Sequence, residues 1–366
     1  MENVCYFNSI KFWGGGEKLH LEYAVSFKRK GYKVYLACNK TSRLAKKGLM
    51  EGLYLFFIKA GNLSFLNPLK YLKLIYFYKK NKIDTVIFSV SQDIKLGGIA
   101  AKIAGVKNIV YLRGLAVPIK NSFINRYIFR KVLTHIVPNS NETKRTIFKY
   151  LGKYINEAKV KVIYHGIEIE KFENTKNINA VIKQKGNGII LGNAGRLTKQ
   201  KGQQYLMDIA RKLNENGIEF TLFIAGTGEL QQSLENKIKE YKLENKVILM
   251  GFVSDIEGFM NSIDIFLLTS EWEGFGYVLV EAMACSKPTI AFDITSNPEI
   301  ISDNETGHLV KFPDTTLFAE KIIALKNNKD KREKMGQAGN QSIYKRFLLN
   351  DRIDEFEQFI INKEKC

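Results

Sequence analysis

The chain has 366 residues, of which 45% are hydrophobic and 25% charged, and its formal net charge is +19. This composition excludes a disordered chain, and the length predicts two domains of ordinary size. The sequence has no apolar run near the ~18 residues of a spanning helix and no signal-peptide pattern in its first thirty residues, so we expect a cytoplasmic protein.

The positive charge is concentrated in the first half of the chain. Residues 1–185 contain 34 Lys and Arg against 11 Asp and Glu, a net charge of +23, whereas residues 186–366 contain 22 against 26, a net charge of −4. A lysine-rich codon bias would mark both halves alike. The asymmetry therefore favours an anionic partner of the first half: a lipid surface, a nucleic acid or a phosphorylated substrate.

Short apolar runs alternate with turns and longer stretches of helical period, which predicts an α/β fold with parallel sheets. The strands predicted in the first half are residues 4–8, 34–38, 53–58, 85–89, 109–112, 135–138 and 160–163. Those predicted in the second half are residues 189–194, 220–225, 247–250, 265–269, 289–292 and 307–310. Each half is thus expected to form its own doubly wound, Rossmann-like unit.

Two further segments complete the predicted organisation. Residues 173–187 are polar, rich in Asn and Lys and without periodicity, so we place a linker there. Residues 350–363 carry Ile353, Phe356, Phe359 and Ile360 at helical spacing, which predicts an amphipathic helix packed on the body of the protein.

Two segments of the first half interleave aromatic and basic residues. Residues 65–82 combine Tyr71, Tyr76, Phe77 and Tyr78 with Lys70, Lys73, Lys79, Lys80 and Lys82. Residues 119–131 combine Phe123, Tyr127 and Phe129 with Lys120, Arg126, Arg130 and Lys131. Such segments suit the headgroup region of an anionic membrane. They also suit ordinary helices whose aromatics face the sheet, and the charge of the first half favours the membrane.

The strongest chemical signal is a pair of glutamates, Glu273 and Glu281, around a glycine-containing turn that leads into a helix. Eight helical steps would separate the two carboxylates by about 12 Å, which suits the two ends of a nucleotide sugar. One carboxylate would bind the sugar hydroxyls and the other the ribose diol. The diphosphate would lie at the helix N-terminus near the backbone of Phe275 and Gly276, where Gly274 and Gly276 permit close approach.

A second cluster, residues 195–202 (GRLTKQKG), directly follows the first strand of the second half. Ligands bind at this edge of doubly wound sheets, and Arg196 and Lys201 are placed to neutralise a diphosphate leaving group. Taken alone, a basic turn is usually a solvated loop, and the paired glutamates make the phosphate interpretation the preferred one.

Other glycine-rich turns match no cofactor motif. Gly14, Gly15, Gly16 and Glu17 follow the opening strand without a Walker G-K-[ST], and Gly226-Thr227-Gly228 lacks the third glycine of a dinucleotide site. The sequence contains no D-x-D and no His/Cys cluster at metal-ligand spacing, so no metal site is expected. The four widely spaced cysteines predict no disulfide framework.

The ordered set of motifs resembles the retaining glycosyltransferases of family 4, of group 1 type. It runs from G-G-G-E (residues 14–17) through V-I-Y-H-G-I-E-I-E-K-F (162–172), G-R-L-x-x-x-K-G, L-F-I-A-G-T-G (222–228), G-F-V (251–253) and E-G-F-G-Y-V-L-V-E-A-M-A (273–284) to N-P-E-I-I (297–301) and T-G-H-L-V (306–310). Each motif alone is unspecific, and the combination is specific and covers nearly the whole chain.

The resemblance implies a GT-B fold, in which two Rossmann-like domains face each other across a cleft. Residues 1–172 would form the acceptor-binding domain, residues 173–187 the linker and residues 188–349 the donor-binding domain. The helix 350–366 would cross back to the first domain.

The resemblance also implies roles for individual residues. Arg196 and Lys201 match the basic pair that holds the donor diphosphate, Glu281 the ribose-binding carboxylate and Glu273 the carboxylate that faces the transferred sugar. The remaining matches are donor contacts: Gly274, Phe275 and Gly276 in the loop that meets sugar and phosphate, Gly226 and Val253 at the neighbouring strand ends, and Gly15 and Gly16 in the first-domain loop that closes over the diphosphate.

The sequence departs from the family pattern in places. Where many relatives have a histidine that meets the donor sugar, residues 111–114 read Tyr-Leu-Arg-Gly, so Arg113 takes that place or contacts a phosphate. His165 replaces a common asparagine and is more simply a turn residue than a base. Ser286 and residues 296–299 replace glycine-rich positions on the donor side, so the pattern does not identify the sugar.

These observations predict a metal-independent, retaining glycosyltransferase that needs no cofactor beyond its UDP- or GDP-linked donor. Its acceptor would be a glycan or a lipid-linked saccharide of bacterial surface polysaccharide or lipopolysaccharide synthesis, and the chain would lie peripherally on the inner face of the cell membrane. The alternatives are a nucleotide-sugar epimerase or sugar phosphorylase of the same fold, or a non-catalytic protein that binds membrane or nucleic acid.

Overall fold

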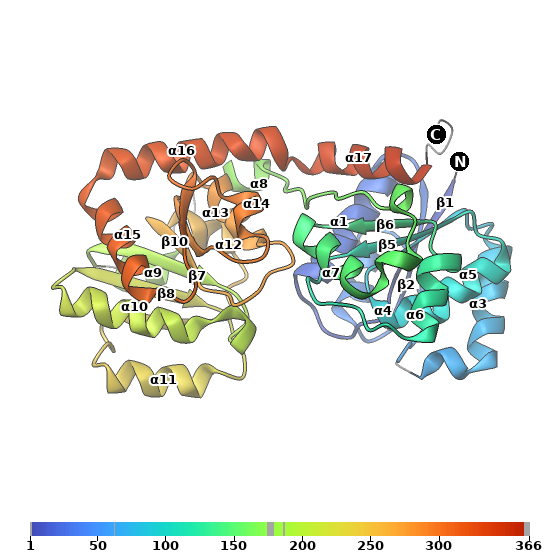
Figure 1. The fold of residues 1–366 in the computed structure, drawn as a ribbon, viewed down its shortest axis with the longest axis horizontal. Helices are drawn as coiled ribbons and strands as arrows, with labels where there is room; N and C mark the ends of the chain where they lie inside the picture. Colours follow the sequence, from blue (N-terminus) through green and yellow to red (C-terminus); the bar gives the residue numbers. More distant parts are fainter. Residues whose placement is uncertain (1, 62, 174–178, 186, 362–366) are drawn as a thin grey trace. The chain divides into compact units, whose positions relative to one another are not determined.

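The structure is a computed structural model that describes residues 2–61, 63–173, 179–185 and 187–361 (Figure 1). The chain divides into two compact units: unit 1 comprises residues up to 165 together with those from 350 onward, and unit 2 comprises residues 166–349. In the described ranges no helix is long and apolar enough to cross a bilayer.

Unit 1 is built on a six-stranded parallel sheet in the order β3-β2-β1-β4-β5-β6. Its strands are β1 (Asn3–Asn8), β2 (Lys33–Cys38), β3 (Tyr54–Phe57), β4 (Thr85–Phe88), β5 (Asn108–Arg113) and β6 (His135–Pro138). The inner strands are buried on both faces, which explains why they consist of continuous apolar runs. The order reverses between β1 and β4, as in a doubly wound fold.

The prediction of a seventh strand in this half, over residues 160–163, is wrong. The backbone N–H of Lys161 donates to Ile136 O at 3.2 Å and that of Ile163 to Pro138 O at 3.0 Å, but only an isolated bridge between Ile136 and Val160 results. A parallel ladder also needs the residue at position 138 to donate to the carbonyl of Lys161. Proline has no N–H, so the ladder stops.

The helices of unit 1 lie on both faces of its sheet (Figure 1). They are α1 (Gly15–Arg29), α2 (Arg43–Met50), α3 (Pro68–Lys80), the short α4 (Ser91–Asp93), α5 (Ile99–Ala104), α6 (Phe123–Tyr127) and α7 (Asn141–Leu151), with π-helical turns η2 (Ile94–Gly98) and η3 (Ile128–Val132). Helices α1 and α2 pack together beside β2 and β3, whereas α3 and α5 pack together with η2.

The helix predicted at the end of the chain forms as α17 (Leu349–Ile361) and packs on unit 1. The Phe356 ring contacts Tyr23 and Phe27 of α1 edge-on at 5.3 and 5.9 Å between centroids. Lys30 forms ion pairs with Asp354 and Glu357. Residues 362–366 lie outside the described residues.

Unit 2 repeats the topology with the order β12-β11-β10-β7-β8-β9. Its strands are β7 (Ile189–Ala194), β8 (Phe220–Ala225), β9 (Val247–Gly251), β10 (Ile265–Leu268), β11 (Thr289–Phe292) and β12 (Gly307–Val310). The helices around it are α8 (Glu170–Glu173), α9 (Ala180–Lys185), α10 (Gln203–Glu215), α11 (Gln231–Glu240), α12 (Ile256–Asn261), α13 (Tyr277–Ala284), α14 (Asn297–Ile300), α15 (Thr315–Asn327) and α16 (Lys329–Arg346). The two sheets confirm the predicted α/β class and GT-B fold.

The division between the units falls earlier than the predicted end of the first domain at residue 172. Ile167 forms a parallel bridge with Leu348, its N–H donates to Phe347 O at 2.8 Å, and Leu349 N–H donates to its carbonyl at 3.0 Å. These bonds attach residues 166–172 to unit 2. Of the predicted linker, residues 180–185 form α9, while 174–178 and 186 lie outside the described residues.

The aromatic residues of the two basic segments are divided between core and surface. In α3, Phe77 and Tyr78 are buried and Tyr71 is half-buried, so these three face the unit as in an ordinary helix. Tyr76 is 64% exposed. In the second segment Phe129 is buried, whereas Phe123 and Tyr127 are 84% and 40% exposed.

Candidate functional site

The candidate site lies where the strand order of unit 2 reverses. Strands β7 and β10 are neighbours at this point, and the chain leaves them toward opposite sides of the sheet. Doubly wound sheets bind ligands at the carboxyl ends of the strands at such a point. The loop after β7 carries the basic turn 195–202, and the loop after β10 carries residues 269–276 with Glu273.

Three strand-end loops are held together by direct backbone contact. Gly226 has φ +145°, and a Cβ on it would lie 1.8 Å from Gly195 O, so only glycine fits. Gly202 has φ +63°, and its Cβ would lie 2.0 Å from Thr269 O. The N–H of Leu197 donates to Thr227 O at 3.0 Å. The loops after β7, β8 and β10 thus form one rigid floor.

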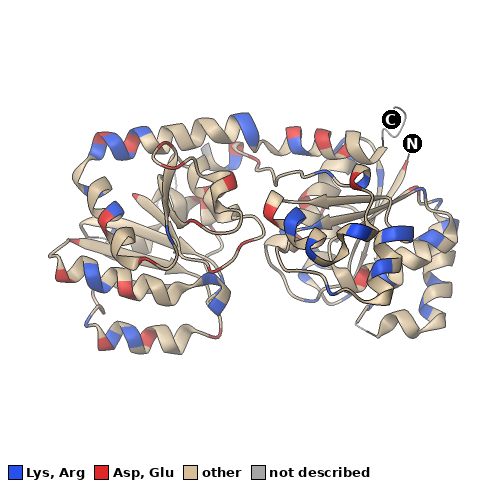
Figure 2. Ribbon diagram, viewed as in Figure 1, with Lys and Arg blue, Asp and Glu red and all other residues tan. Residues whose placement is uncertain are grey.

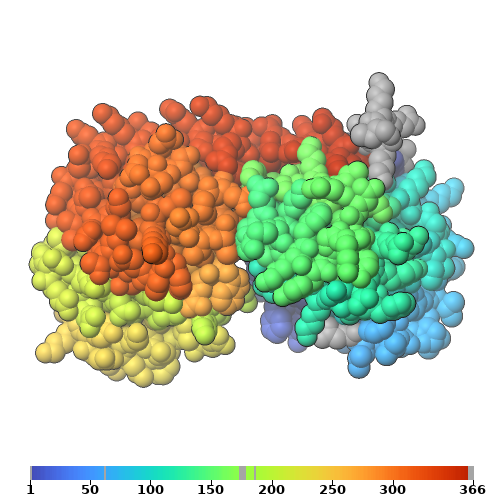
Figure 3. Space-filling view, viewed as in Figure 1, coloured from blue at the N-terminus to red at the C-terminus, as the bar shows by residue number. Residues whose placement is uncertain are grey.

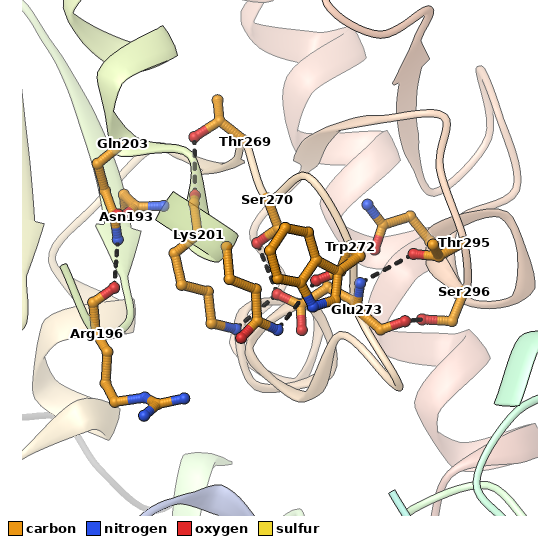
Figure 4. A network of polar contacts seen from close by, with 12 residues as sticks. Asn193, Arg196, Lys201, Gln203, Thr269, Ser270, Trp272, Glu273, Thr295 and Ser296 are labelled. Atoms are coloured by element: carbon orange, nitrogen blue, oxygen red, sulfur yellow. Dashed lines mark hydrogen bonds and ion pairs between the residues drawn. The ribbon is translucent and has the colours of Figure 1, made fainter. Parts of the chain in front are cut away.

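Lys201 and Glu273 meet on this floor although they are far apart in the sequence (Figure 4). Lys201 Nζ lies 2.6 Å from Glu273 Oε1, and Ser270 Oγ donates to the same oxygen at 2.6 Å. The Lys201 side chain is 18% exposed and that of Glu273 only 6%. A lysine ammonium has three donors, so Lys201 can hold Glu273 and still offer N–H groups to an anion.

The backbone of Glu273 is also fixed by hydroxyl side chains of the loop after β11. Its N–H donates to Thr295 Oγ1 at 3.0 Å, and Ser296 Oγ donates to its carbonyl at 3.4 Å (Figure 4). Sequence analysis missed Ser270, Thr295 and Ser296 in this role. Their signal, hydroxyl residues directly after adjacent strands, is present in the sequence but common.

Arg196 differs from Lys201 in being exposed. Its carbonyl accepts a hydrogen bond from Gln203 Nε2 at 3.0 Å, while its side chain extends away from the network (Figure 4). Among the contacts between described residues, the guanidinium has neither a hydrogen bond nor an ion pair. Of the two predicted phosphate-binding cations of the basic turn, Lys201 is therefore engaged by Glu273 and Arg196 is open to a ligand.

Glu281 lies within α13, and the turn that contains Phe275 and Gly276 leads into this helix. Glu281 and Phe275 are buried, and Gly276 is the N-cap of the helix. A Cβ on Gly276 would lie 2.9 Å from Leu279 Cδ1 and 3.2 Å from Asn297 Oδ1, so the turn is shaped for glycine. Because α13 begins only at Tyr277, the predicted carboxylate separation of about 12 Å, which assumed eight helical steps, does not apply.

Four buried amide oxygens near this edge accept no hydrogen bond within the described part of the protein: Asn193 Oδ1, Gln203 Oε1, Gln204 Oε1 and Asn297 Oδ1. Asn193 is at the end of β7 and donates to Leu267 O at 2.8 Å, while Asn297 donates to Phe292 O at 2.9 Å. Buried acceptors are normally satisfied, so these positions are ready for a donor group of a ligand.

Three of the predicted donor contacts, Gly15, Gly16 and Arg113, belong to unit 1, and their positions are described within that unit. Gly15 and Gly16 begin α1, and a Cβ on either would meet no atom within 4 Å, so this backbone is open. Arg113, predicted to meet the donor, is instead buried: its Nη1 donates to Tyr111 Oη at 2.7 Å and its Nη2 to Val117 O at 2.8 Å. These bonds hold the loop after β5, and a donor contact by Arg113 stays a prediction.

The reversal point of unit 1, between β1 and β4, carries a buried carboxylic acid. Asp93 accepts hydrogen bonds from Ser9 N–H at 2.8 Å and Ser9 Oγ at 2.5 Å. Burial raises the pKa of Asp93 to about 7, although both hydrogen bonds from Ser9 lower it. Asp93 thereby fixes the start of the loop that leads to Gly15 and Gly16.

Two of the buried histidines, His20 and His165, are neutral and only weakly basic at neutral pH. Burial lowers the pKa of His20 and of His165 to about 3. His165 Nε2 lies 3.1 Å from Asn139 Nδ2, in agreement with the predicted turn role. Val253 is half-buried just beyond β9. Among the described residues no three His, Cys, Asp or Glu side chains gather as a metal site would require.

Comparison with known proteins agrees with this geometry. The model described as Glycosyltransferase Family 4 matches residues 13–171, and the model described as Glycosyl transferases group 1 matches residues 174–342. The chain is 25% identical to the UDP-Gal:alpha-D-GlcNAc-diphosphoundecaprenol alpha-1,3-galactosyltransferase of Escherichia coli, over 98% of this chain and 96% of the relative. It is 28% identical to the capsular polysaccharide biosynthesis glycosyltransferase CapM of Staphylococcus aureus, over 78% of each.

A solved structure of Anabaena HepE in complex with UDP has the same fold, with a TM-score of 0.84 at 19% identity over 97% of this chain and 98% of that one. The two family models lie in tandem, one on each unit, and together they cover most of the chain. The chain therefore belongs to the group 1 glycosyltransferases of family 4, and it is a glycosyltransferase.

Proposed function

We propose that the protein transfers a sugar, with retention of anomeric configuration, from a UDP- or GDP-linked donor to a glycan or lipid-linked acceptor in bacterial surface polysaccharide or lipopolysaccharide synthesis. The observation that carries the proposal is the Lys201–Glu273 pair beside the open guanidinium of Arg196 at the reversal point of unit 2. The Escherichia coli relative, whose name specifies a UDP-sugar donor and a diphosphoundecaprenol-linked acceptor, supports this substrate class.

The donor is held by cations at its diphosphate and by hydrogen-bond acceptors at its ribose and sugar hydroxyls. Arg196 and Lys201 bind the diphosphate, and Glu281 accepts hydrogen bonds from the ribose diol. Glu273 accepts them from the sugar hydroxyls, while Gly274, Phe275 and Gly276 bring the backbone close to the donor. The buried acceptors of Asn193 and Asn297 add places for hydroxyl or N–H donors. Gly226, Val253 and, from unit 1, Gly15 and Gly16 contribute backbone contacts.

The transfer needs no metal ion in this proposal, because the ammonium and the guanidinium supply the positive charge that stabilises the leaving diphosphate. The sequence has no D-x-D, the usual carboxylate handle for a metal-bound nucleotide diphosphate. Activity that is unchanged in EDTA supports the proposal, and activity that EDTA abolishes and Mg²⁺ or Mn²⁺ restores contradicts it.

Retention follows if the acceptor enters on the face that the phosphate leaves. The bond between the anomeric carbon and the phosphate oxygen breaks, a bond to the acceptor oxygen forms on the same face, and the departing phosphate takes the acceptor's proton. Glu273 is a poor nucleophile, since its Oε1 already accepts hydrogen bonds from Lys201 and Ser270. A covalent glycosyl adduct trapped on Glu273 would refute this step.

The experiment is calorimetric titration with UDP, GDP and ADP in EDTA. The wild type is expected to bind one of the three tightly, and Glu281→Ala to lose that binding. Glu320→Gln, which removes an exposed carboxylate of α15, is the matched control and should bind normally. No binding of any nucleotide to the wild type would argue against the donor site. Nucleotide-sugar turnover without an acceptor, or with free phosphate, would instead favour an epimerase or a phosphorylase.

We also propose that the protein works peripherally at the anionic inner face of the cell membrane, with unit 1 toward the lipid. The net charge of +23 on residues 1–185 supports this orientation. Binding to anionic vesicles that weakens steeply with salt is the expected result, and equal binding to neutral vesicles would contradict it. Tight salt-sensitive binding to a polynucleotide, unchanged in Glu281→Ala, would support the non-catalytic alternative.

A further inference from the structure

The outer face of α3 and the turn before it expose a row of large apolar side chains. Leu63, Leu66, Leu69, Leu72 and Tyr76 are 73%, 67%, 72%, 64% and 64% exposed. They follow one another at steps of three, three, three and four residues through the 3-10 turn η1 (Ser64–Leu66) and α3. We call these five residues the leucine stripe.

The stripe is not a by-product of core packing. At about 100° per residue, Leu69, Leu72 and Tyr76 lie within about 60° of one another around the helix axis. The opposite face of the helix carries Leu74 and Tyr78, which are buried in the core of unit 1. Helix α3 therefore has two apolar faces, and only one of them is covered within the unit.

The charges around the stripe all have one sign. Between Glu51 and Asp84 the sequence contains six lysines and no acidic residue, and Figure 2 shows α3 in blue and tan only. Lys79 and Lys80 flank the stripe at the end of the helix, and Lys80 Nζ lies 5.6 Å from the centre of the Tyr76 ring. Lys73 instead donates to Phe57 O of β3 at 3.2 Å. In the described parts of the chain, none of the lysines at positions 59 to 82 forms an ion pair.

A row of exposed leucines among lysines that form no ion pair in the described part of the chain fits one kind of surface best. Helices that lie in the plane of a bilayer bury their apolar side chains among the acyl chains and place lysines at anionic headgroups. A protein partner would bring acidic residues only at chosen points, whereas an anionic bilayer offers negative charge along the whole row. The light-blue atoms of this segment form part of the molecular surface in Figure 3.

We propose that the leucine stripe inserts into the interfacial region of an anionic membrane, with Lys79 and Lys80 on lipid headgroups. This inference deepens the proposed function, on which it rests, by naming the element that meets the lipid. The sequence led us to expect aromatic residues at the membrane, but Phe77 and Tyr78 are buried. The inserted side chains are therefore mostly leucines, and Tyr76 is the one aromatic residue of the stripe.

The test is flotation of the full chain with vesicles of phosphatidylglycerol and phosphatidylcholine, without donor or acceptor. The triple variant Leu66→Ser/Leu69→Ser/Leu72→Ser is expected to bind at least about tenfold more weakly, because three apolar side chains no longer leave water. Lys79→Gln/Lys80→Gln should keep the insertion and lose part of the salt dependence. Folding is checked by circular dichroism, and nucleotide binding to unit 2 should be unchanged in both variants.

The matched control is Leu49→Ser/Met50→Ser, which removes two apolar side chains of α2 that are 66% and 77% exposed beside Lys46 and Lys47. This variant should bind vesicles like the wild type. Vesicle binding that is equal in the stripe variant and the wild type would overturn the proposal, even if the chain binds its nucleotide. A wild-type dimer that the stripe variant converts to a monomer, with no vesicle binding by either, would assign the stripe to a second copy instead.

Discussion

The ion pair between Lys201 and Glu273 offers the sharpest test of how the site of unit 2 is held together. Replacing Lys201 by Met keeps most of the side-chain volume and removes the charge that faces Glu273. The carboxylate then retains the hydrogen bond from Ser270 Oγ at 2.6 Å, but it stays almost wholly buried. A buried carboxylate without a counter-charge destabilises the folded state.

The magnitude follows from the geometry. At 2.6 Å and an effective dielectric constant of about 20, the attraction between the two charges is about 6 kcal/mol before desolvation. Removal of one partner from a buried pair typically costs about 3–5 kcal/mol. Because the Lys201 side chain is 18% exposed and Ser270 remains, we expect Lys201→Met to lower the free energy of unfolding of unit 2 by about 2–4 kcal/mol.

Substitution of the partner, Glu273, is milder, and the losses of the two single variants are not additive. Glu273→Gln keeps an acceptor for Ser270 and leaves an ammonium that reaches water, so we expect a loss of about 1–2 kcal/mol. The double variant Lys201→Met/Glu273→Gln buries no charge. Its loss should be smaller than the sum of the two single losses by about 1–3 kcal/mol, the range found for contacting residues.

The two tryptophans make the measurement specific to one unit, since Trp13 belongs to unit 1 and Trp272 to unit 2. In a Trp13→Phe background, urea unfolding followed by fluorescence reports on Trp272, the neighbour of Glu273. The control is Lys199→Met, which removes an exposed lysine of the same turn and should change the free energy of unfolding by less than about 0.5 kcal/mol. Strictly additive single losses would refute the reasoning, because they would mean that the two charges do not interact in the folded protein.

Four further outcomes are expected. Gly226→Ala places a Cβ 1.8 Å from Gly195 O at φ +145° and should both destabilise unit 2 and abolish nucleotide binding in calorimetry. Gly217→Ala, with φ +67° and no atom within 4 Å, should cost only about 1 kcal/mol in urea unfolding. Burial raises the pKa of Asp93 from 3.8 to about 7, so the native state binds more protons between these values and stability falls as pH rises. Asp93→Asn should remove this slope in urea midpoints measured at pH 5 and pH 8. Burial lowers the pKa of His20 from 6.5 to about 3, so the unfolded state binds more protons in that range and stability falls as pH decreases. His20→Leu should flatten the decrease between pH 6.5 and pH 4, and an unchanged slope would contradict the assignment to His20.

The strands were predictable from the sequence to within a residue or two because a parallel strand buried on both faces must be a continuous apolar run. Residues 189–194 and 220–225 are examples in which prediction and structure coincide. Residues 160–163 have the same local composition, yet they form no strand because their neighbour in space is Pro138. That cause lies more than twenty residues away in the chain, and local periodicity cannot reveal it.

The candidate site shows the same limit. The motifs placed Arg196, Lys201, Glu273 and Glu281 in one unit, but nothing in their spacing paired Lys201 with Glu273, 72 positions away. The pairing depends on β7 and β10 being neighbours, which is a property of the sheet order. Residues 65–82 show another limit: the sequence drew attention to their aromatic residues, whereas burial decides which side chains reach the surface, and the exposed positions hold Leu66, Leu69 and Leu72 beside Tyr76.

The two units share one topology but gather different side chains at the reversal point of the sheet. At the reversal point of unit 2 the structure gathers cations, Arg196 and Lys201, which suits a diphosphate. At the corresponding point of unit 1 the gathered side chains are Asn8, Ser9 and Asp93, which hold the backbone in place and add no positive charge. Many lysines of unit 1 lie on outer elements such as α3, although Lys11 and Lys40 follow β1 and β2 at the sheet edge. Since exposed charges act over about 8 Å at physiological salt, the lysines of α3 are too far out to act on a ligand at the sheet edge, which supports our proposal that α3 meets an anionic surface.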